Sequence, residues 1–215
     1  MEKYRNKYRI QSHRKPNWDY SSEAMYFITF ITQNRICNLG NVVNGEMVLS
    51  EFGKIVELEW FKSFEIRLEL FLDEFVIMPN HLHAIVIINN PNDVVANVVA
   101  NANVVVVETH GRASLRSSPS SASPSSASSN EKPIMPTRLP KSISSFIAGF
   151  KSGVNSKIDD FIDENALNMP KFNRNNHFFQ PNYHDHIIRN DAEYHRIKNY
   201  IINNPVNWNK DKFYE

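Results

Sequence analysis

Two apolar runs in the middle of the chain restrict its fold more than any other feature. The first covers residues 70–78 and the second residues 83–88, with Pro79-Asn80 between them. Apolar runs bounded by turn residues are typical of buried strands, and a proline-containing break is typical of a turn or a strand entrance. We therefore predict two antiparallel strands at the centre of a sheet.

Other patterns predict the remaining elements. They are a strand at residues 26–32, a hairpin at 41–48 around Asn44-Gly45, a helix from Ser50 to about Phe64, a helix that begins near Lys141, and a last helix from Asn190 or Asp191 that ends before Pro205. The rules used are turn chemistry, helical periodicity, N-capping and the exclusion of proline from helices. The order predicts an α+β fold in which helices pack on one face of an antiparallel sheet.

Low-complexity sequence interrupts this pattern. Residues 92–107 consist almost wholly of Val, Asn and Ala, and residues 114–129 are mostly serine. A serine tract buries too little apolar surface to offset the entropy of ordering it. We predict a disordered insertion at 91–137 in a single domain of residues 1–215; its valine-rich part either extends a strand or is a repeat expansion.

Charge and cysteine content limit the function classes. The formal net charge of +1 excludes a polycation, although the N-terminal arm of residues 1–20 is basic. This arm suits either phosphate contacts or a solvated terminus. Cys37 is the only cysteine, which excludes an intrachain disulfide. No run approaches the about 20 apolar residues of a membrane helix, and no apolar leader is present. We expect a soluble cytoplasmic protein with no membrane partner.

The second apolar run is preceded by His81-Leu82-His83. Residues i and i+2 of a strand point to the same face, roughly 6.6 Å apart. His81 and His83 therefore suit a shared metal ion while Leu82 faces the core. The alternative is two histidines that flank a leucine on a half-exposed strand without binding a metal.

A tyrosine in the last predicted helix is the second candidate. Tyr200 and Asn204 are one helical turn apart and share a face. The amide oxygen of Asn204 suits the third position of a two-histidine metal site; Asn203 is the fallback, because Asn204 precedes a proline. The alternative for Tyr200 is an ordinary packing residue of an amphipathic helix.

These motifs resemble a known family. The Pro79-Asn80-His81-Leu82-His83 segment is similar to the His-hydrophobe-His (HUH) motif. Tyr200-x-x-x-Asn204-Pro205 is similar to the nucleophile helix of REP-associated tyrosine transposases, which are bacterial relatives of the insertion-sequence single-strand transposases. The resemblance spans nearly the whole chain outside residues 91–137. Further matching stretches are residues 8–10, 18–20, 26–29, 146–151 and 183–190, the last with Asp185-His186-x-Ile188-Arg189.

The resemblance implies a ferredoxin-like HUH endonuclease fold and a mechanism. A divalent ion, Mg²⁺ or Mn²⁺, would be held by His81, His83 and Asn204, and Tyr200 would form a covalent 5′-phosphotyrosine with single-stranded or hairpin DNA. Two imidazoles suit Mn²⁺ better than Mg²⁺ and tolerate Zn²⁺. The protein is expected to act as a monomer or a homodimer in a bacterial cytoplasm.

A single-strand binder also needs cations and aromatic rings along its groove. The candidates are Arg9, Arg14, Lys15, Trp18, Arg35, Lys151 and Arg189. For each of them the alternative is an ordinary surface side chain. His184 and His186 form a second His-x-His pair, to which we assign a structural or DNA-contacting role rather than metal binding.

Two features depart from the family pattern. The insertion directly follows the histidine strand, and residues 173–182 are rich in asparagine where the family often has a tryptophan. Two other functions therefore remain open. One is a domesticated protein that binds hairpin DNA without cutting it, and the other is a small-molecule metallohydrolase that uses His81 and His83.

Overall fold

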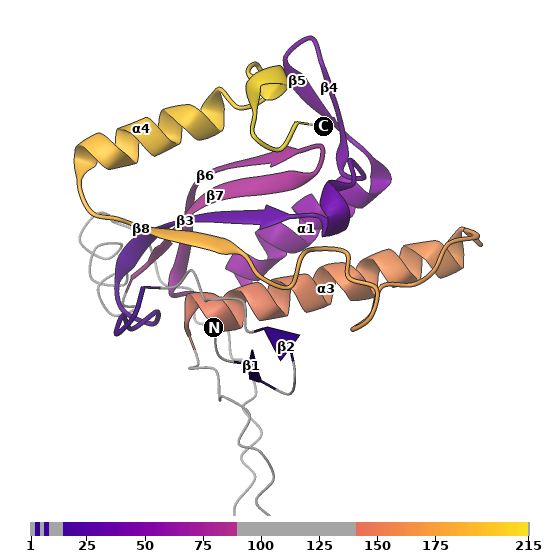
Figure 1. Cartoon of the computed structure of the whole chain (residues 1–215), viewed down its shortest axis with the longest axis horizontal. Coiled ribbons are helices and arrows are strands. Elements are labelled where there is room, and N and C mark those ends of the chain that lie inside the picture. The colour runs from indigo at the N-terminus through magenta and orange to yellow at the C-terminus, as the bar shows by residue number, and fades with distance from the viewer. Residues whose placement is uncertain (1–2, 5–6, 9–14, 90–140, 215) are drawn as a thin grey trace, which may run out of the picture.

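The computed structural model describes residues 3–4, 7–8, 15–89 and 141–214 (Figure 1). The expected insertion at 91–137 and the candidates Arg9 and Arg14 lie outside the described residues. The elements are β1 (Lys3–Tyr4), β2 (Lys7–Tyr8), β3 (Ala24–Ile31), η1 (Gln33–Arg35), β4 (Gly40–Val43), β5 (Glu46–Leu49), α1 (Glu51–Glu65), β6 (Leu70–Met78), β7 (His81–Ile88), α3 (Ile143–Glu164), β8 (His184–Ile188), α4 (Asp191–Ile202) and η2 (Trp208–Lys210).

Four strands form an antiparallel sheet in the order β6-β7-β3-β8. Along the chain, α1 connects β3 to β6 and α3 lies between β7 and β8, so the order of elements is β-α-β-β-α-β. In each β-α-β unit another strand separates the two strands that the helix connects. This is the ferredoxin-like arrangement. The predicted α+β class is confirmed, and α1 and α3 cover one face of the sheet (Figure 1).

The side chains of β7 alternate between the two faces of the sheet. Leu82, Ala84 and Val86 belong to the main core together with α1 and α3. At the centre of this core the ring of Trp60 lies 5.3 Å from that of Phe146. The odd-numbered residues of β7 point to the opposite face, which is where the histidines are.

The last helix packs on this opposite face, unlike α1 and α3 (Figure 1). Ile197 and Ile201 of α4 form a small apolar cluster with Ile85 of β7 and Ile188 of β8. The expectation of helices on one face therefore holds for α1 and α3, while α4 follows its own apolar stripe to the other side. Its packing brings the C-terminal part of the helix beside the start of β7.

The sequence-based prediction was wrong about two strands. β6 was expected at the centre of the sheet, but within the described residues it pairs with β7 alone. Its ladder is irregular between Leu72 and Glu74, and charged residues and bulges are common devices of edge strands. β8 was not predicted at all, because only its last two residues, Ile187 and Ile188, are buried.

Local capping follows the predictions. Ser50 Oγ accepts a hydrogen bond from Gly53 N at 3.0 Å and begins α1, and Asn190 caps α4 in the same way through Glu193 N. The hairpin turn of β4 and β5 has φ values of 54° at Asn44 and 81° at Gly45. Positive φ at both central residues is the requirement of a type I′ turn, which an Asn-Gly pair meets at low cost.

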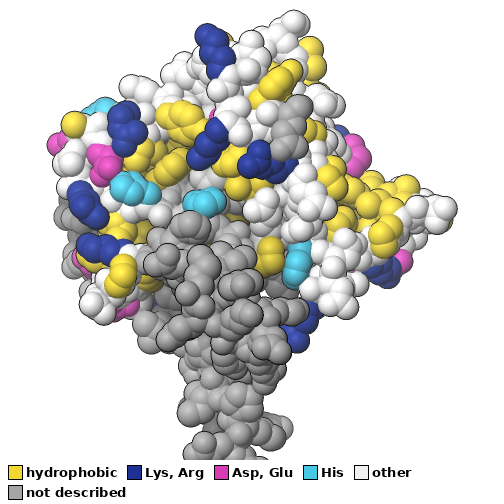
Figure 2. Space-filling model, in the orientation of Figure 1, with side chains coloured by type: hydrophobic (Ala, Val, Ile, Leu, Met, Phe, Trp, Pro, Cys, Tyr) yellow, Lys and Arg dark blue, Asp and Glu magenta, His cyan; other side chains and the backbone are white. Residues whose placement is uncertain are grey.

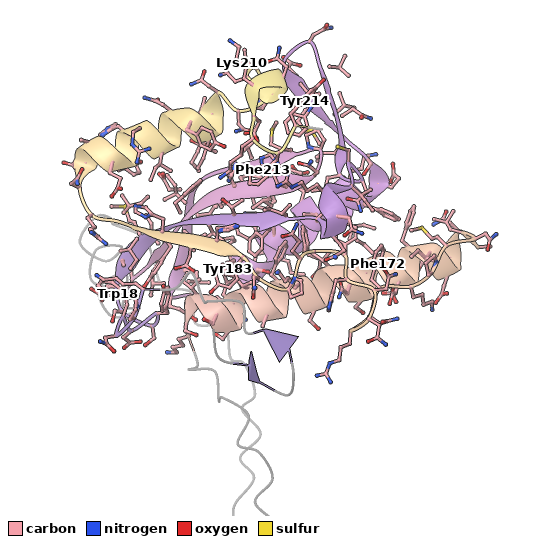
Figure 3. The ribbon with its side chains drawn as sticks, viewed as in Figure 1. Trp18, Phe172, Tyr183, Lys210, Phe213 and Tyr214 are labelled. Carbon is pink, nitrogen blue, oxygen red and sulfur yellow. The ribbon has the colours of Figure 1, made fainter. Side chains whose placement is uncertain are left out.

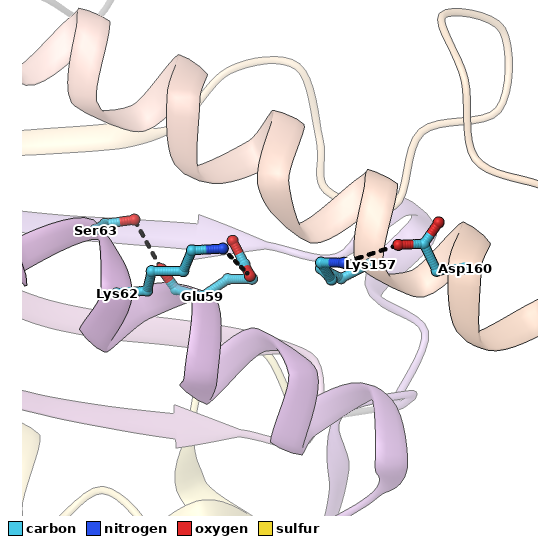
Figure 4. A network of polar contacts seen from close by, with 5 residues as sticks. All are labelled: Glu59, Lys62, Ser63, Lys157 and Asp160. Carbon is cyan, nitrogen blue, oxygen red and sulfur yellow. Dashed lines mark hydrogen bonds and ion pairs between the residues drawn. The ribbon is translucent and has the colours of Figure 1, made fainter. Parts of the chain in front are cut away.

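Polar side chains edge the contact between α1 and α3 (Figure 4). Lys62 pairs with Glu59 within α1, and Lys157 pairs with Asp160 within α3, so these ion pairs support each helix separately. Beneath these side chains, the ring of Trp60 in α1 packs against Phe146 and Phe150 of α3. Among the helices that the structure describes, none is long and apolar enough to cross a membrane.

Replacement of Gly53 by alanine should destabilise the fold. A Cβ atom at this buried position of α1 would lie 2.1 Å from the backbone oxygen of Leu39. Alanine favours helices by about 1 kcal/mol over glycine, but overpacking against backbone costs about 1–3 kcal/mol. We expect Gly53→Ala to lower the free energy of unfolding measured with urea.

Gly149→Ala in α3 is the matched control, because its Cβ would meet only the movable tip of Arg67, at 2.9 Å. That variant should be neutral or more stable than the parent. Equal stability of the two variants would show that the close approach at Gly53 is not a constraint.

Candidate metal and nucleophile site

The first two odd-numbered residues of β7 lie together under the C-terminal end of the chain. His81 and His83 are 0% and 1% exposed, and their ring centres are 4.6 Å apart. The two imidazoles share one face while Leu82 lies in the main core, as the strand periodicity predicts. Both rings also contact Phe213, with ring centres 4.6 and 6.1 Å away.

Asn80 determines the tautomer of His81. The Asn80 amide nitrogen donates to the carbonyl oxygens of Phe213, at 2.8 Å, and Arg35, at 3.2 Å. Its amide oxygen therefore faces His81 Nδ1, 2.9 Å away, and can only accept. His81 must carry its hydrogen on Nδ1, which leaves the Nε2 lone pair open. Nε2 is buried and has no hydrogen-bond partner.

Thr29 and Tyr200 lie at the two nitrogens of His83. Thr29 Oγ1 is 2.8 Å from Nδ1, and the Tyr200 hydroxyl is 3.1 Å from Nε2. A hydroxyl both donates and accepts, so Thr29 supports either tautomer of His83. The Tyr200 hydroxyl donates its one hydrogen to Asp211 Oδ2, so it accepts from His83 Nε2, and Thr29 donates to Nδ1. A metal ion on Nε2 would require the other tautomer, in which His83 Nδ1 donates to Thr29.

The C-terminal segment adds a carboxylate to the site. Asp211 Oδ2 accepts hydrogen bonds from the Tyr200 hydroxyl and from Asn204 Nδ2, both at 3.1 Å. Asn204 is 2% exposed, and its amide oxygen is buried without a hydrogen-bond partner. Asn203, in contrast, is exposed, and its amide nitrogen donates to Asn199 O at 2.7 Å. Asn204 is therefore the asparagine that faces the histidines.

This donor set fits a divalent metal ion. One ligand atom from each of His81, His83 and Asp211 lies within 4.8 Å of the others. Two imidazoles and a carboxylate suit first-row divalent metals. Nε2 of His81 and Oδ1 of Asn204 are buried acceptors without partners, and an unpaired buried polar atom is costly unless the site has a further occupant.

Burial determines the pKa values of the side chains at the site. It lowers the pKa of His81 to about 4 and the pKa of His83 well below 6.5, so both imidazoles are neutral at pH 7. Neutral imidazole is the form that binds metals. Burial, together with the carboxylate of Asp211, raises the pKa of Tyr200 to about 12, so the phenol keeps its proton at pH 7.

Asp211 and the positioning residues Asn80 and Thr29 were missed by the sequence analysis. Asn80 was interpreted as a turn residue and as part of the Pro-Asn-His-Leu-His segment, without a role of its own. Thr29 lies directly opposite His83 in the ladder of β3 and β7, a register that the separate strands do not reveal. Asp211 carried no signal, because the fold of the C-terminal segment brings it to Tyr200.

The described candidates for DNA contacts lie in several places. Arg35 is beside the histidines, with its guanidinium carbon 5.8 Å from the ring centre of Phe213. Lys15 and Trp18 lie near Tyr26, toward the other end of β3, where Trp18 Nε1 donates to the Tyr26 hydroxyl at 3.1 Å. Lys15 and Trp18 therefore lie outside the candidate site.

Lys151 and Arg189 also lie away from the histidines. Lys151 belongs to α3, on the other face of the sheet, and its ammonium donates to Gln180 O at 2.6 Å. Burial lowers the pKa of Lys151 to about 8. Arg189 follows β8, at the start of α4, and its backbone nitrogen donates to Glu193 Oε2. Glu193 also contacts the ring of His186, at 2.7 Å.

The metal-free protein should lose stability as the pH falls from 6.5 to 4. In this window the unfolded chain protonates a histidine with an ordinary pKa of 6.5, while folded His81, with a pKa of about 4, stays neutral. The unfolded state then binds more protons, so the free energy of unfolding falls with pH, by up to about 3 kcal/mol for this group. Urea unfolding with a chelator at several pH values measures the effect.

His81→Gln should reduce this pH dependence, whereas His195→Gln, which removes an exposed histidine of α4, should retain it in full. The same slope in all three proteins would contradict the assignment to His81.

No family model matches the chain. The structure of a REP-associated tyrosine transposase bound to a REP hairpin is similar, with a TM-score of 0.49 at 15% sequence identity, over 94% of this chain and 77% of that chain. An uncharacterized protein of Haemophilus influenzae is 30% identical over 212 residues, which cover 95% of this chain and 92% of the relative. At that identity and coverage, this chain belongs to the same protein family as the Haemophilus influenzae protein.

Proposed function

We propose that this protein cuts and rejoins single-stranded DNA in a reaction that depends on a divalent metal, with Tyr200 as the nucleophile. One observation carries the proposal. The Tyr200 hydroxyl lies 3.1 Å from His83 Nε2 and 3.1 Å from Asp211 Oδ2, beside the unpartnered Nε2 of His81. A nucleophile next to a pair of imidazoles and a carboxylate suits phosphoryl transfer.

His81 and His83 would hold the metal, with the carboxylate of Asp211 and the amide oxygen of Asn204 as further ligands. The cluster of ligand atoms and the unpartnered Asn204 oxygen support this set. The bound ion would neutralise charge on the phosphate under attack and offset the positive free energy of phenol ionisation. Imidazole ligands favour Mn²⁺ over Mg²⁺.

The reaction exchanges one ester bond for another. The Tyr200 oxygen attacks phosphorus, the bond from phosphorus to the 3′ oxygen breaks, and the 5′ phosphate stays on the tyrosine. Asp211 Oδ2 already accepts the phenol hydrogen and would receive the proton, while the leaving 3′ oxygen takes up a proton from solvent. Attack by a 3′ hydroxyl on the phosphotyrosine reverses the step and joins strands without external energy.

The accessibility of the phenol supports a large substrate. Tyr200 is 40% exposed, while the two histidines beneath it are buried. A polymer can therefore reach the nucleophile at the surface while the metal ligands stay rigid. The resemblance of the His-x-His and Tyr-x-x-x-Asn-Pro motifs to single-strand transposases is the reason for choosing DNA hairpins as the substrate class.

Tyr200→Phe should abolish a covalent protein–DNA adduct. Labelled single-stranded hairpin oligonucleotides are incubated with the protein and Mn²⁺ or Mg²⁺, and the products are separated on a denaturing gel. The parent protein should give a protein-linked band that a chelator removes. Without the phenol oxygen no phosphotyrosine can form, so the band should disappear, while binding of the oligonucleotide should persist.

Tyr214→Phe is the matched control, since Tyr214 is an exposed tyrosine of the same C-terminal segment. That variant should form the adduct normally. Binding of hairpins without any adduct would instead favour a protein that binds DNA without cutting it. Metal-dependent hydrolysis of small esters that survives Tyr200→Phe would favour a metallohydrolase.

A further inference from the structure

Two small cavities adjoin the side chain of Tyr200. The first, of about 270 Å³, is lined by Phe27, His83, Arg196, Ile197, Tyr200 and Lys212. The second, of about 220 Å³, is lined by Tyr200, Asn203, Asn204, Asn207, Lys210 and Asp211. Tyr200 is the only residue that lines both, so the candidate nucleophile lies at the boundary between them.

The C-terminal segment contributes one lysine to each cavity. Lys210 and Lys212 flank Asp211, whose carboxylate accepts the Tyr200 hydroxyl hydrogen. Phe213 anchors the segment, because its backbone nitrogen donates to Asp211 Oδ1 at 2.7 Å and its ring packs on His81. In Figure 3 Lys210 lies at the outer edge of the segment and Phe213 lies over the sheet.

The positive charges around Tyr200 favour the binding of an anion. The ammonium of Lys212 lies 4.6 Å from the ring centre of Phe213, and its charge lowers the pKa of both His81 and His83. The carboxylate of Asp211 offsets only one positive charge, so a divalent cation on the two histidines together with this ammonium would leave the site positively charged and would favour a bound anion. Among the described residues, neither Lys210 nor Lys212 forms an ion pair.

Lys and Arg side chains gather on this face over α4 and the C-terminal segment (Figure 2). Arg196 adds a cation to the cavity of Lys212, with its side chain 72% exposed. Phe27 adds an aromatic ring there. Proteins that bind single strands combine two components: cations along the sugar-phosphate backbone, and aromatic rings on which the bases stack. Each cavity is smaller than the about 300 Å³ of a typical small-molecule site, so together they suit an extended chain better than one compact ligand.

We propose that a single DNA strand crosses Tyr200 from one cavity to the other, with Lys212 and Lys210 binding the phosphates on opposite sides of the one that is cut. This inference rests on the proposed function and names the path of its substrate. It assigns a role to two lysines that the motifs do not include. In the sequence Lys210-Asp211-Lys212, the carboxylate contacts the nucleophile and the two lysines bind the strand.

The salt dependence of DNA binding tests the two lysines. Binding of a labelled oligothymidylate is measured by fluorescence anisotropy over a series of salt concentrations. Each phosphate contact to single-stranded DNA contributes about −0.7 to the slope of log affinity against log salt. Lys210→Ala and Lys212→Ala should each reduce the magnitude of the slope by about 0.7, and the double variant by about 1.4.

Lys157→Ala is the matched control, because it removes the same charge from α3 on the other face of the sheet. Its slope should equal that of the parent. Equal slopes in all the variants, or no binding of oligothymidylate, would overturn the proposed path. The covalent adduct is a separate readout: if it forms and depends on Tyr200 while the slopes do not change, the proposed function stands and this path is wrong.

Uncharged phosphate analogues then test which phosphate each lysine binds. In a hairpin that forms the adduct, a methylphosphonate is placed either one phosphate upstream or one downstream of the cleaved position. A neutral phosphate removes the partner of one lysine, so a variant that already lacks that lysine should lose no further affinity. Lys212→Ala should therefore be insensitive to one of the two methylphosphonates, and Lys210→Ala should be insensitive to the other. If both lysines respond to the same phosphate, the strand does not cross Tyr200 between them.

Discussion

The side-chain amide of Asn80 connects the parts on which the candidate site depends. Its nitrogen donates to the carbonyl oxygens of Arg35 and Phe213, and its oxygen accepts from His81. One side chain thus joins the loop after β3, the start of β7 and the C-terminal segment. Because Asn80 is fully buried, loss of any of these bonds would leave an unpaired polar group inside the protein. The orientation of His81 and the position of Asp211 both follow from this arrangement.

Burial of a polar atom without a hydrogen-bond partner costs free energy. The open lone pair on His81 Nε2 has no partner, and the phenol of Tyr200 is held in its protonated form by burial and by Asp211. A divalent cation would satisfy the first group and favour ionisation of the second. The geometry of these residues therefore suits a divalent cation, and in the proposed reaction that cation would favour ionisation of Tyr200.

The sequence was informative wherever local rules decide structure. Alternation in β7, the Asn44-Gly45 turn, the Ser50 and Asn190 caps and the one-turn spacing of Tyr200 and Asn204 gave the elements, and they put His81 and His83 on one face. It failed where tertiary contacts decide. The edge position of β6, the partly exposed strand β8, the packing of α4 on the opposite face and the approach of Asp211 to Tyr200 depend on residues far apart in the chain.

The central claim is that His81 and His83 jointly bind a metal ion beside Tyr200. Pulsed electron paramagnetic resonance of the Mn²⁺-loaded protein tests it directly, because a coordinated imidazole nitrogen couples to the electron spin of the metal. We expect couplings from two histidine nitrogens, with one lost in His81→Gln and the other in His83→Gln. A spectrum with no nitrogen coupling, or one unchanged by either substitution, would contradict it.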